Sequence, residues 1–146
     1  MAHLPVRDDF SHFVVQSTRW RDEDRFGHVN NAMYFTYEET TRLAYLDRVL
    51  APHLLGQKGA VILAHVECDF VAQLHHPTEF EMALRIDSLG GSSMTSEGAI
   101  FVGDQVVAVT HSVIVFFDYE ANSSLRIPED ARAAIRAFER RAPEEK

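Results

Sequence analysis

The sequence contains very little lysine and cysteine, and each shortage excludes a class of protein. Lys58 and Lys146 are the only lysines, no stripe of arginines replaces them, and the formal net charge is −8. Nucleic acid is therefore not expected as a partner, because its recognition depends on clustered positive charge. Cys68 is the only cysteine, so no disulfide can form within the chain.

Long apolar runs and leader-like segments are also missing. No apolar stretch is long enough to span a bilayer, so no membrane partner is expected. The first ten residues include Arg7, Asp8 and Asp9 and lack the apolar centre of a secretory signal, so we expect a cytoplasmic protein. With no repeat or linker in its 146 residues, the chain should form one domain over 1–146, with a core from about 13 to 140.

The pattern changes from strand to helix early in the chain. β-Branched and aromatic residues predict a first strand over Phe13–Trp20. A segment from about Asn31 to Leu50, followed by Pro52, has apolar residues at helical spacing. Its first two turns are apolar around much of the circumference, which predicts a helix covered by protein on most sides. Glu38 and Arg42 within it are spaced for an i, i+4 ion pair.

A period of two residues then predicts four strands, over 61–71, 78–87, 93–102 and 105–117. Gly90-Gly91 and Gly103-Asp104 suit tight hairpin turns. In the first of these strands one face is expected to be wholly apolar and to consist of Ile62, Ala64, Val66, Cys68 and Phe70. A second, shorter helix is expected to follow with Pro128 in its first turn.

This order of elements predicts an α+β fold. Consecutive hairpins would make the later strands antiparallel, and their inward face needs a cover. The long apolar helix can provide it. We therefore expect a curved antiparallel five-stranded sheet wrapped around a long central helix, plus a short C-terminal helix.

The stretch from Asp24 to Ala32 carries the chemistry. It places one carboxylate, Asp24, a few residues before the expected helix start, with Gly27 and two asparagines between them. A helix N-terminus presents unpaired N–H groups and a positive dipole end, which can polarise a carbonyl oxygen. A carboxylate beside that end can attack the carbonyl or direct a water at it. The pattern therefore indicates a minimal acyl-transfer site.

At these residues the chain resembles the hot-dog fold, and specifically the 4-hydroxybenzoyl-CoA thioesterase-like family of acyl-CoA thioesterases. The residues that carry the resemblance are Asp24, Gly27, His28, Val29, Asn30, Asn31, Ala32, Tyr34, Glu38 and Arg42. The resemblance implies that Asp24 is catalytic, as nucleophile or general base, and that the backbone N–H of Asn31 binds the thioester oxygen. It also implies an acyl-CoA substrate, no cofactor, and a homodimer or homotetramer with active sites between subunits.

The chain departs from the founding branch of that family around the aspartate. Arg25-Phe26 stands where that branch has Pro-Ala, and His28 and Asn30 stand where it has apolar or aromatic residues. His28, Asn30 and Tyr34 are the candidate substrate-binding residues. Asn30 is expected first as the helix N-cap, and His28 could contact substrate, orient water or pack between subunits. Tyr34 could line an acyl pocket or simply belong to the core.

Several other residues could in principle support different chemistry. His65 with Glu67, or the pair His75-His76, could ligate a metal, but no third ligand stands at a telling spacing and none is expected. Cys68 lies on the apolar strand face and is expected to be a buried structural thiol. No Gly-x-Ser-x-Gly elbow exists, which argues against a serine hydrolase. The nearby arginines, which could bind an anionic ligand or offset neighbouring acids, are Arg19, Arg21 and Arg25.

Two rival functions stay open. One is a hot-dog enoyl-CoA hydratase or dehydratase that uses Asp24 and His28 as an acid/base pair. That family has Asn-Pro between the two residues and a longer spacing, which Arg25-Phe26-Gly27 does not match. The other is a non-catalytic acyl-CoA-binding module that keeps the fold.

Overall fold

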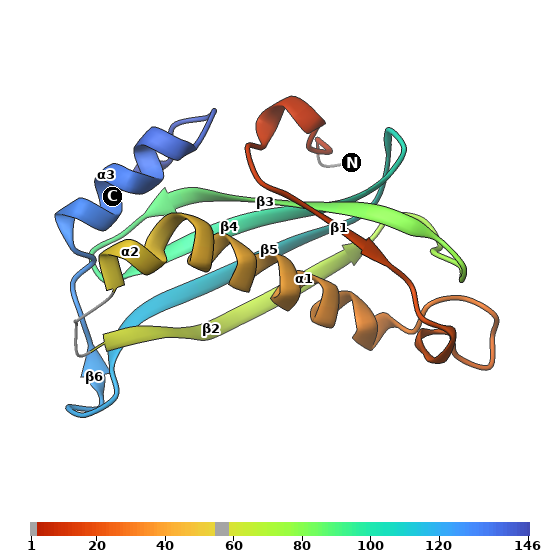
Figure 1. Cartoon of the computed structure of the whole chain (residues 1–146), viewed down its shortest axis with the longest axis horizontal. Helices are drawn as coiled ribbons and strands as arrows, with labels where there is room; N and C mark the ends of the chain where they lie inside the picture. Colours follow the sequence, from red (N-terminus) through yellow and green to blue (C-terminus); the bar gives the residue numbers. More distant parts are fainter. Residues whose placement is uncertain (1–2, 55–58) are drawn as a thin grey trace.

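The computed structural model describes residues 3–54 and 59–146. Five long strands form a curved antiparallel sheet, and a long helix lies across one face of it (Figure 1). The strands are β1 (Phe13–Ser17), β2 (Gly59–Phe70), β3 (Glu79–Leu89), β4 (Ser93–Val102) and β5 (Gln105–Asp118), with short β6 (Ser123–Ser124) on β5 and β7 (Glu144–Glu145) on β3. The predicted fold class is confirmed.

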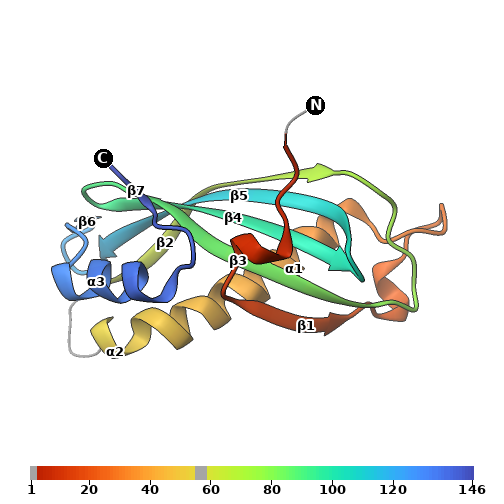
Figure 2. The same ribbon diagram turned by 90° about the horizontal axis from the view of Figure 1, so that it is seen from above.

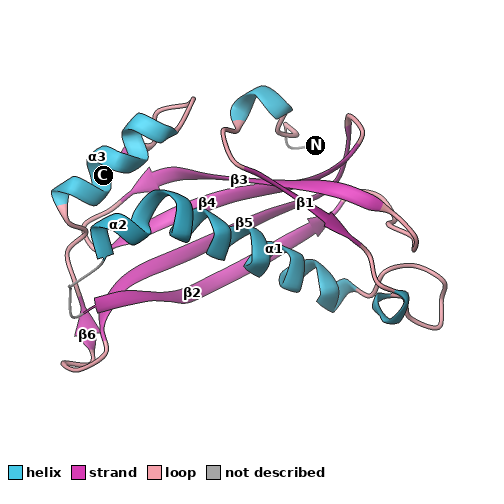
Figure 3. Ribbon diagram, in the orientation of Figure 1, coloured by secondary structure: helices cyan, strands magenta, loops and turns pink. Residues whose placement is uncertain are grey.

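Helical elements lie before, between and after the strands (Figure 3). They are the short 3₁₀ turns η1 (Arg7–Asp9) and η2 (Trp20–Asp22), the long helix α1 (Asn31–Tyr45), the π-helical turn η3 (Leu46–Leu50), α2 (Ala51–Leu54) and α3 (Glu129–Phe138). The first strand is shorter than predicted, because the chain leaves the sheet after Ser17 and turns through η2. Pro128 is the N-cap of α3 and not part of its first turn.

The strand order differs from a simple series of hairpins. The sheet runs β1-β3-β4-β5-β2, so β2 lies beside β5 and not beside β3. The prediction that consecutive hairpins join all four later strands is therefore wrong for β2. Only β3-β4 and β4-β5 are joined by tight turns, at Gly90-Gly91 and Gly103-Asp104. The segment between β2 and β3 instead passes from the edge of the sheet formed by β2 to the half that contains β3, near the start of α1 (Figure 1).

The long helix starts where predicted and ends later. Asn30 is the N-cap, and its side chain accepts the N–H of Ala32 at 3.0 Å. The helical path continues through η3 and α2 to Leu54, so the predicted end before Pro52 is wrong. In the π-turn the N–H of Ala51 bonds to the carbonyl of Leu46. The wider turn accommodates the proline, because it shifts the carbonyls that a proline ring would meet in a regular helix.

Only one side of α1 is covered within this chain. Tyr34, Tyr37 and Tyr45 face the sheet and are buried, whereas Phe35 is 36% exposed and Leu43 is 51% exposed. The prediction of a helix surrounded on most sides is therefore wrong for a single chain, because the sheet covers one face only (Figure 2). Glu38 and Arg42 form the predicted pair, with Arg42 Nε 3.5 Å from Glu38 Oε1, and both side chains are buried.

A bulge in β2 changes which residues face the helix. The pairing with β5 slips between Leu63 and His65, so Ala64 is the extra residue. Before the bulge, Leu63 pairs with buried Ile114, which places Leu63 on the helix side and Ile62 on the outer side. The predicted apolar face is therefore wrong for Ile62 and Ala64. It holds from Val66 onward.

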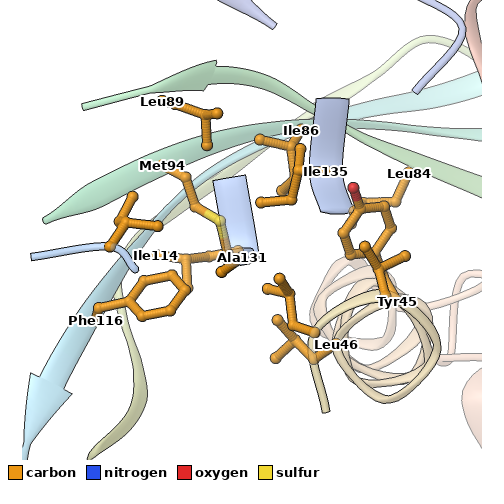
Figure 4. Packing of buried hydrophobic residues seen from close by; sticks show 13 residues of the cluster. Tyr45, Leu46, Leu84, Ile86, Leu89, Met94, Ile114, Phe116, Ala131 and Ile135 are labelled. Carbon is orange, nitrogen blue, oxygen red and sulfur yellow. The ribbon is translucent and has the colours of Figure 1, made fainter. Parts of the chain in front are cut away.

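The interior consists of separate clusters along the helix. The largest lies between the end of α1, the sheet and α3, with Tyr45 reaching toward Leu84 and α3 covering the strands (Figure 4). A second cluster lies under the start of α1 and includes Tyr34, Tyr37, Phe80 and Met82. A third cluster, around Phe10, Ala83, Ala99, Phe101, Val106 and Val109, covers part of the outer face of the sheet.

The C-terminal residues are anchored to the domain by main-chain and side-chain contacts. The N–H of Lys146 donates to the carbonyl of Leu89, and β7 pairs with β3. The guanidinium of Arg136 contacts Glu145 at 2.7 Å and Glu129 at 3.0 Å. Across the described parts of the chain, no helix has the length and apolar character needed to cross a bilayer.

Candidate active site

The loop that carries the motif is held in a compact turn. The N–H of Asp24 donates to the carbonyl of His28 at 3.0 Å, and the N–H of Gly27 donates back to the carbonyl of Asp24 at 3.2 Å. Gly27 has a φ of +84°, a conformation that residues with a side chain rarely adopt. The N–H of Val29 then donates to the carbonyl of Leu74 at 2.7 Å, which ties the loop to the segment after β2.

Asp24 is half-buried. Its Oδ1 accepts the N–H of Phe26 at 2.8 Å, which closes a local turn. Closing a turn is a purely structural role, and it is the alternative to a catalytic role for Asp24. It occupies one carboxylate oxygen, and the backbone bond to His28 keeps the residue beside the start of α1.

The first turn of α1 leaves one amide unused. The side chain of Asn30 accepts the N–H of Ala32, and the carbonyl of Asn30 accepts the N–H of Met33 at 2.9 Å. The N–H of Asn31 donates to no acceptor among residues 3–54 and 59–146. A free N–H at the positive end of a helix is a suitable donor for a carbonyl oxygen that gains negative charge.

A pocket of about 250 Å³ opens beside this amide, and its walls are His28, Val29, Asn31, Tyr34, Phe70, Val71, Ala72 and Gln73. The structure therefore brings together three of the predicted site residues, His28, Asn31 and Tyr34. Asp24 and Asn30 are not part of the wall. Asn30 caps the helix, and the backbone N–H of Asp24 is bonded to the carbonyl of His28, a wall residue.

The far wall of the pocket was not foreseen from the sequence. Tyr34 meets the ring of Phe70 edge-on, with centroids 4.9 Å apart. The N–H groups of Val71 and Ala72 both donate to the carbonyl of Val107, at 2.9 and 3.1 Å. The main chain therefore holds this wall in place. Burial raises the pKa of Tyr34, so its hydroxyl stays protonated at neutral pH.

The neighbouring histidines His75 and His76 bind different partners and do not form a common site. His75 Nδ1 lies 2.9 Å from the carbonyl oxygen of Gly27, and His76 Nδ1 lies 2.9 Å from the hydroxyl of Thr18. On β2, His65 and Glu67 are exposed and 3.5 Å apart. No group of three or more His, Cys, Asp or Glu side chains in the described residues has an arrangement that could hold a metal ion.

The three arginines near the motif and Cys68 lie outside the pocket wall. Arg19 contacts Asp22 at 3.1 Å. Of the two roles considered for the arginines, Arg19 therefore has the one of offsetting a neighbouring acid. Arg21 and Arg25 are exposed, and the Arg25 guanidinium lies 5.8 Å from the centroid of the Phe26 ring. Cys68 is half-buried on the helix side of β2, and burial raises the pKa of its thiol to about 12.

The motif and the pocket both lie within a region shared with a known protein family. The family model described as "Thioesterase-like superfamily" matches residues 18–135, which include the whole motif and the pocket. The chain belongs to the Thioesterase-like superfamily.

Solved structures similar to this chain support that membership. The PA5185 protein of Pseudomonas aeruginosa is 33% identical with a TM-score of 0.82, and the match covers 94% of this chain and 98% of that one. A thioesterase of Thermus thermophilus, solved with coenzyme A and Zn, is 29% identical with a TM-score of 0.80, covering 91% and 97%.

A curated sequence relative aligns with a smaller part of this chain. The uncharacterized protein YsmA of Bacillus subtilis is 29% identical over 89 residues, which is 61% of this chain and 60% of that protein. The aligned part is therefore less than two thirds of that relative's length.

In this member of the superfamily, one carboxylate near the site was not among the predicted residues. Asp22 lies two residues before Asp24 and is fully buried, whereas Asp24 is not. The only signal in the sequence is the Asp-x-Asp spacing together with a tyrosine two turns into the helix. Neither predicts burial, because that depends on how η2 folds against α1.

Proposed function

We propose that this protein hydrolyses acyl-CoA thioesters to a free acid and CoA, with Asp24 and the backbone N–H of Asn31 as its catalytic groups. The observation that carries the proposal is the unused Asn31 N–H on the wall of a pocket, beside the loop that holds Asp24. Membership of the Thioesterase-like superfamily and similarity to a thioesterase solved with coenzyme A support the reaction class.

The reaction follows from those two groups. The thioester carbonyl enters the pocket with its oxygen toward the Asn31 N–H. Asp24 either removes a proton from a water that attacks the carbonyl carbon, or attacks that carbon itself to form an anhydride that water then hydrolyses. In both routes the carbonyl oxygen gains negative charge, which a preorganised N–H stabilises by about 3–4 kcal/mol. The carbon–sulfur bond then breaks, and the CoA thiolate leaves and takes up a proton.

His28 and Tyr34 are proposed to contact the acyl group or the water in this pocket, since both form its wall. Phe70 and Val71 supply apolar surface opposite them. Asn30 acts through the helix, because its side chain is used as the cap of α1.

A second copy of the chain is proposed to complete the site. β2 is a 12-residue strand at the edge of the sheet, and no strand of residues 3–54 or 59–146 pairs with its free edge. Leu63, Phe70 and Val71 are exposed along it at 40%, 45% and 39%. An unpaired apolar edge of this length favours pairing with another strand. Pairing of β2 with its own copy would close the side of the pocket that Phe70 and Val71 form.

A panel of acyl-CoAs tests the activity. Aliphatic thioesters of increasing chain length and an aromatic one are incubated with the protein, and release of free thiol is followed beside hydration of an enoyl-CoA. Thiol release supports the proposal. Hydration without thiol release would indicate the hydratase function, and binding without turnover would indicate a non-catalytic module.

The role of Asp24 is tested by substitution. Asp24→Asn should lower kcat by at least 100-fold with the fold intact, since it removes the base or nucleophile. Asp47→Asn, the same change at an exposed site in η3, is the matched control and should keep full activity. Normal hydrolysis by Asp24→Asn would remove Asp24 from the reaction. A single turnover in ¹⁸O-water separates the two routes, because label appearing in Asp24 itself requires the anhydride.

The second copy is tested through the oligomeric state. Leu63→Arg should yield monomers in sedimentation experiments and lower activity, because it places charge on the β2 edge. Val15→Arg, at an apolar site 62% exposed on the opposite edge strand, is the control and should leave the assembly intact. A monomeric wild-type protein with full activity would contradict this part of the proposal.

A further inference from the structure

The buried carboxylate of Asp22 is joined to helix α1 by a short hydrogen bond. The hydroxyl of Tyr37 donates to Asp22 Oδ2 at 2.6 Å, in a fully buried environment. The same Oδ2 accepts the backbone N–H of Arg19 at 2.9 Å, and Oδ1 accepts the Arg19 side chain at 3.1 Å. Both carboxylate oxygens are therefore used, and the residue presents nothing to a substrate.

The charge of this carboxylate is stabilised in place. Burial pushes the pKa of Asp22 upward, but hydrogen bonds from Tyr37 and Arg19, together with the Arg19 charge, hold it below its usual range. Asp22 is thus ionised at neutral pH. A charge-assisted hydrogen bond of this kind is stronger and more directional than one between neutral groups.

The main chain of Asp22 holds the other end of the catalytic loop. Its carbonyl accepts the N–H of Asn30 at 2.8 Å, which closes the loop between the two residues. Asp24 lies two residues after Asp22, and Asn31 follows Asn30 directly. The point where the loop closes is therefore fixed to the helix by Tyr37, about two turns from the helix start.

We propose that Asp22 is a positioning residue, which uses the hydrogen bond from Tyr37 to set the placement of the Asp24 carboxylate relative to the Asn31 N–H. The inference rests on the proposed function. Neither Asp22 nor Tyr37 forms part of the pocket wall, so loss of their hydrogen bond should leave substrate binding largely unchanged. It should reduce the rate of the chemical step, because small misplacements of catalytic groups lower rates by about 10- to 100-fold.

The same helix offers a matched control for a purely structural effect. Tyr45, about two turns further along α1, also donates from a buried hydroxyl to a buried carboxylate, Glu139 Oε2 at 3.0 Å. Tyr37→Phe and Tyr45→Phe each remove one such hydrogen bond. Only the first lies beside the catalytic loop.

The experiment compares kcat, KM and thermal stability for wild type, Tyr37→Phe, Asp22→Asn, the double variant and Tyr45→Phe, with Asp24→Asn as the inactive reference. Tyr37→Phe should lower kcat by about tenfold or more, with KM within about twofold of wild type. Tyr45→Phe should lose stability but keep kcat. The double variant should be no slower than Asp22→Asn alone, since Asp22→Asn already removes the negative charge that strengthens the hydrogen bond from Tyr37.

Affinity for a non-hydrolysable thioether analogue of the substrate provides a readout besides turnover, and Tyr37→Phe should bind it as wild type does. If Asp22→Asn fails to fold, Tyr37→Phe carries the test alone. Tyr37→Phe with a wild-type kcat, or with a raised KM and unchanged kcat, would overturn the positioning role. The proposed function would still stand in that case, provided that Asp24→Asn is inactive. Wild-type protein that releases no thiol from any acyl-CoA would overturn both.

Discussion

The hydroxyl of Tyr45 donates to Glu139 Oε2 at 3.0 Å and joins α1 to the C-cap residue of α3. The same Oε2 accepts the N–H of Ile86 at 2.6 Å, so one carboxylate links two helices and the sheet. Its other oxygen, Oε1, is buried and has no hydrogen-bond partner among the residues that the structure describes. When a buried carboxyl group has hydrogen bonds to only one of its oxygens, the stability of the fold depends on whether that group is charged.

The stability of the fold should therefore depend on pH through Glu139. Burial, opposed by the hydrogen bonds from Ile86 and Tyr45 and by the Arg85 charge, raises the pKa of Glu139 to about 7. The folded state thus binds a proton more tightly than the unfolded state, so stability decreases as the pH rises from about 5 to 8. At pH 8, Glu139→Gln should unfold at a higher temperature than wild type, with a free energy of unfolding larger by about 1–3 kcal/mol. The difference should vanish below about pH 5.

Thermal melts across this range check the prediction, with Glu144→Gln, an exposed glutamate of the same tail, as control. Burial lowers the pKa of His12, which weakens the fold at acid pH in all three proteins alike, so variants are compared at each pH. A Glu139→Gln protein that is equally less stable at every pH would contradict the assignment.

The helix cap at Asn30 should contribute to stability independently of substrate. Asn30→Ala removes the acceptor for the Ala32 N–H and should lower stability by about 1 kcal/mol. Asn30→Asp keeps an acceptor and should melt close to wild type. If the aspartate variant folds normally but loses activity, Asn30 contacts the substrate and its role is more than a cap.

The close approach of β4 and β5 at Gly98 should not tolerate a side chain. A methyl group on Gly98 would collide with the Thr110 hydroxyl and would also meet the Ala83 carbonyl at 3.2 Å. Gly98→Ala should lower stability by about 1–3 kcal/mol. Adding Thr110→Ala should recover part of that loss, whereas Gly91→Ala, where a methyl group meets only Arg126 at 4.0 Å, should be nearly neutral. Additive losses in the double variant would contradict the collision.

The thiol of Cys68 should be nearly inert in the folded protein. Burial raises its pKa to about 12, so the reactive thiolate is scarce at neutral pH. A disulfide reagent at pH 8 should modify Cys68 slowly in buffer and rapidly in denaturant. The comparison is Cys68→Ser combined with Ser124→Cys, which places the one thiol on exposed β6. Equal rates for the two proteins would show that Cys68 is accessible.

Local signals in the sequence predicted the elements whose causes are local. Asn30 indicated the helix start because a cap needs only its own side chain and the next turn. The hairpin at Gly103-Asp104 lies where predicted, and Gly103 has the positive φ, +60°, that such a turn requires. Within the site, His28, Asn31 and Tyr34 meet as expected since they belong to one loop and one helical turn.

Features that depend on distant contacts were not predictable in this way. The bulge at Ala64 reverses the face of Ile62, and nothing in the alternation of β2 marks where its register with β5 slips. The position of β2 beside β5 depends on the whole sheet and not on the connecting turn. Asp22 looked like one acid among several, because its burial arises only when Tyr37 folds over it.

The wall formed by residues 70–73 is held by main-chain bonds to Val107, while the side chains of Val71 and Gln73 are exposed. Replacing those two side chains can therefore alter what the protein accepts without disturbing how it folds. With the proposed function, substitutions at these two positions are the changes through which acyl preference can diverge or be redesigned while the fold is kept.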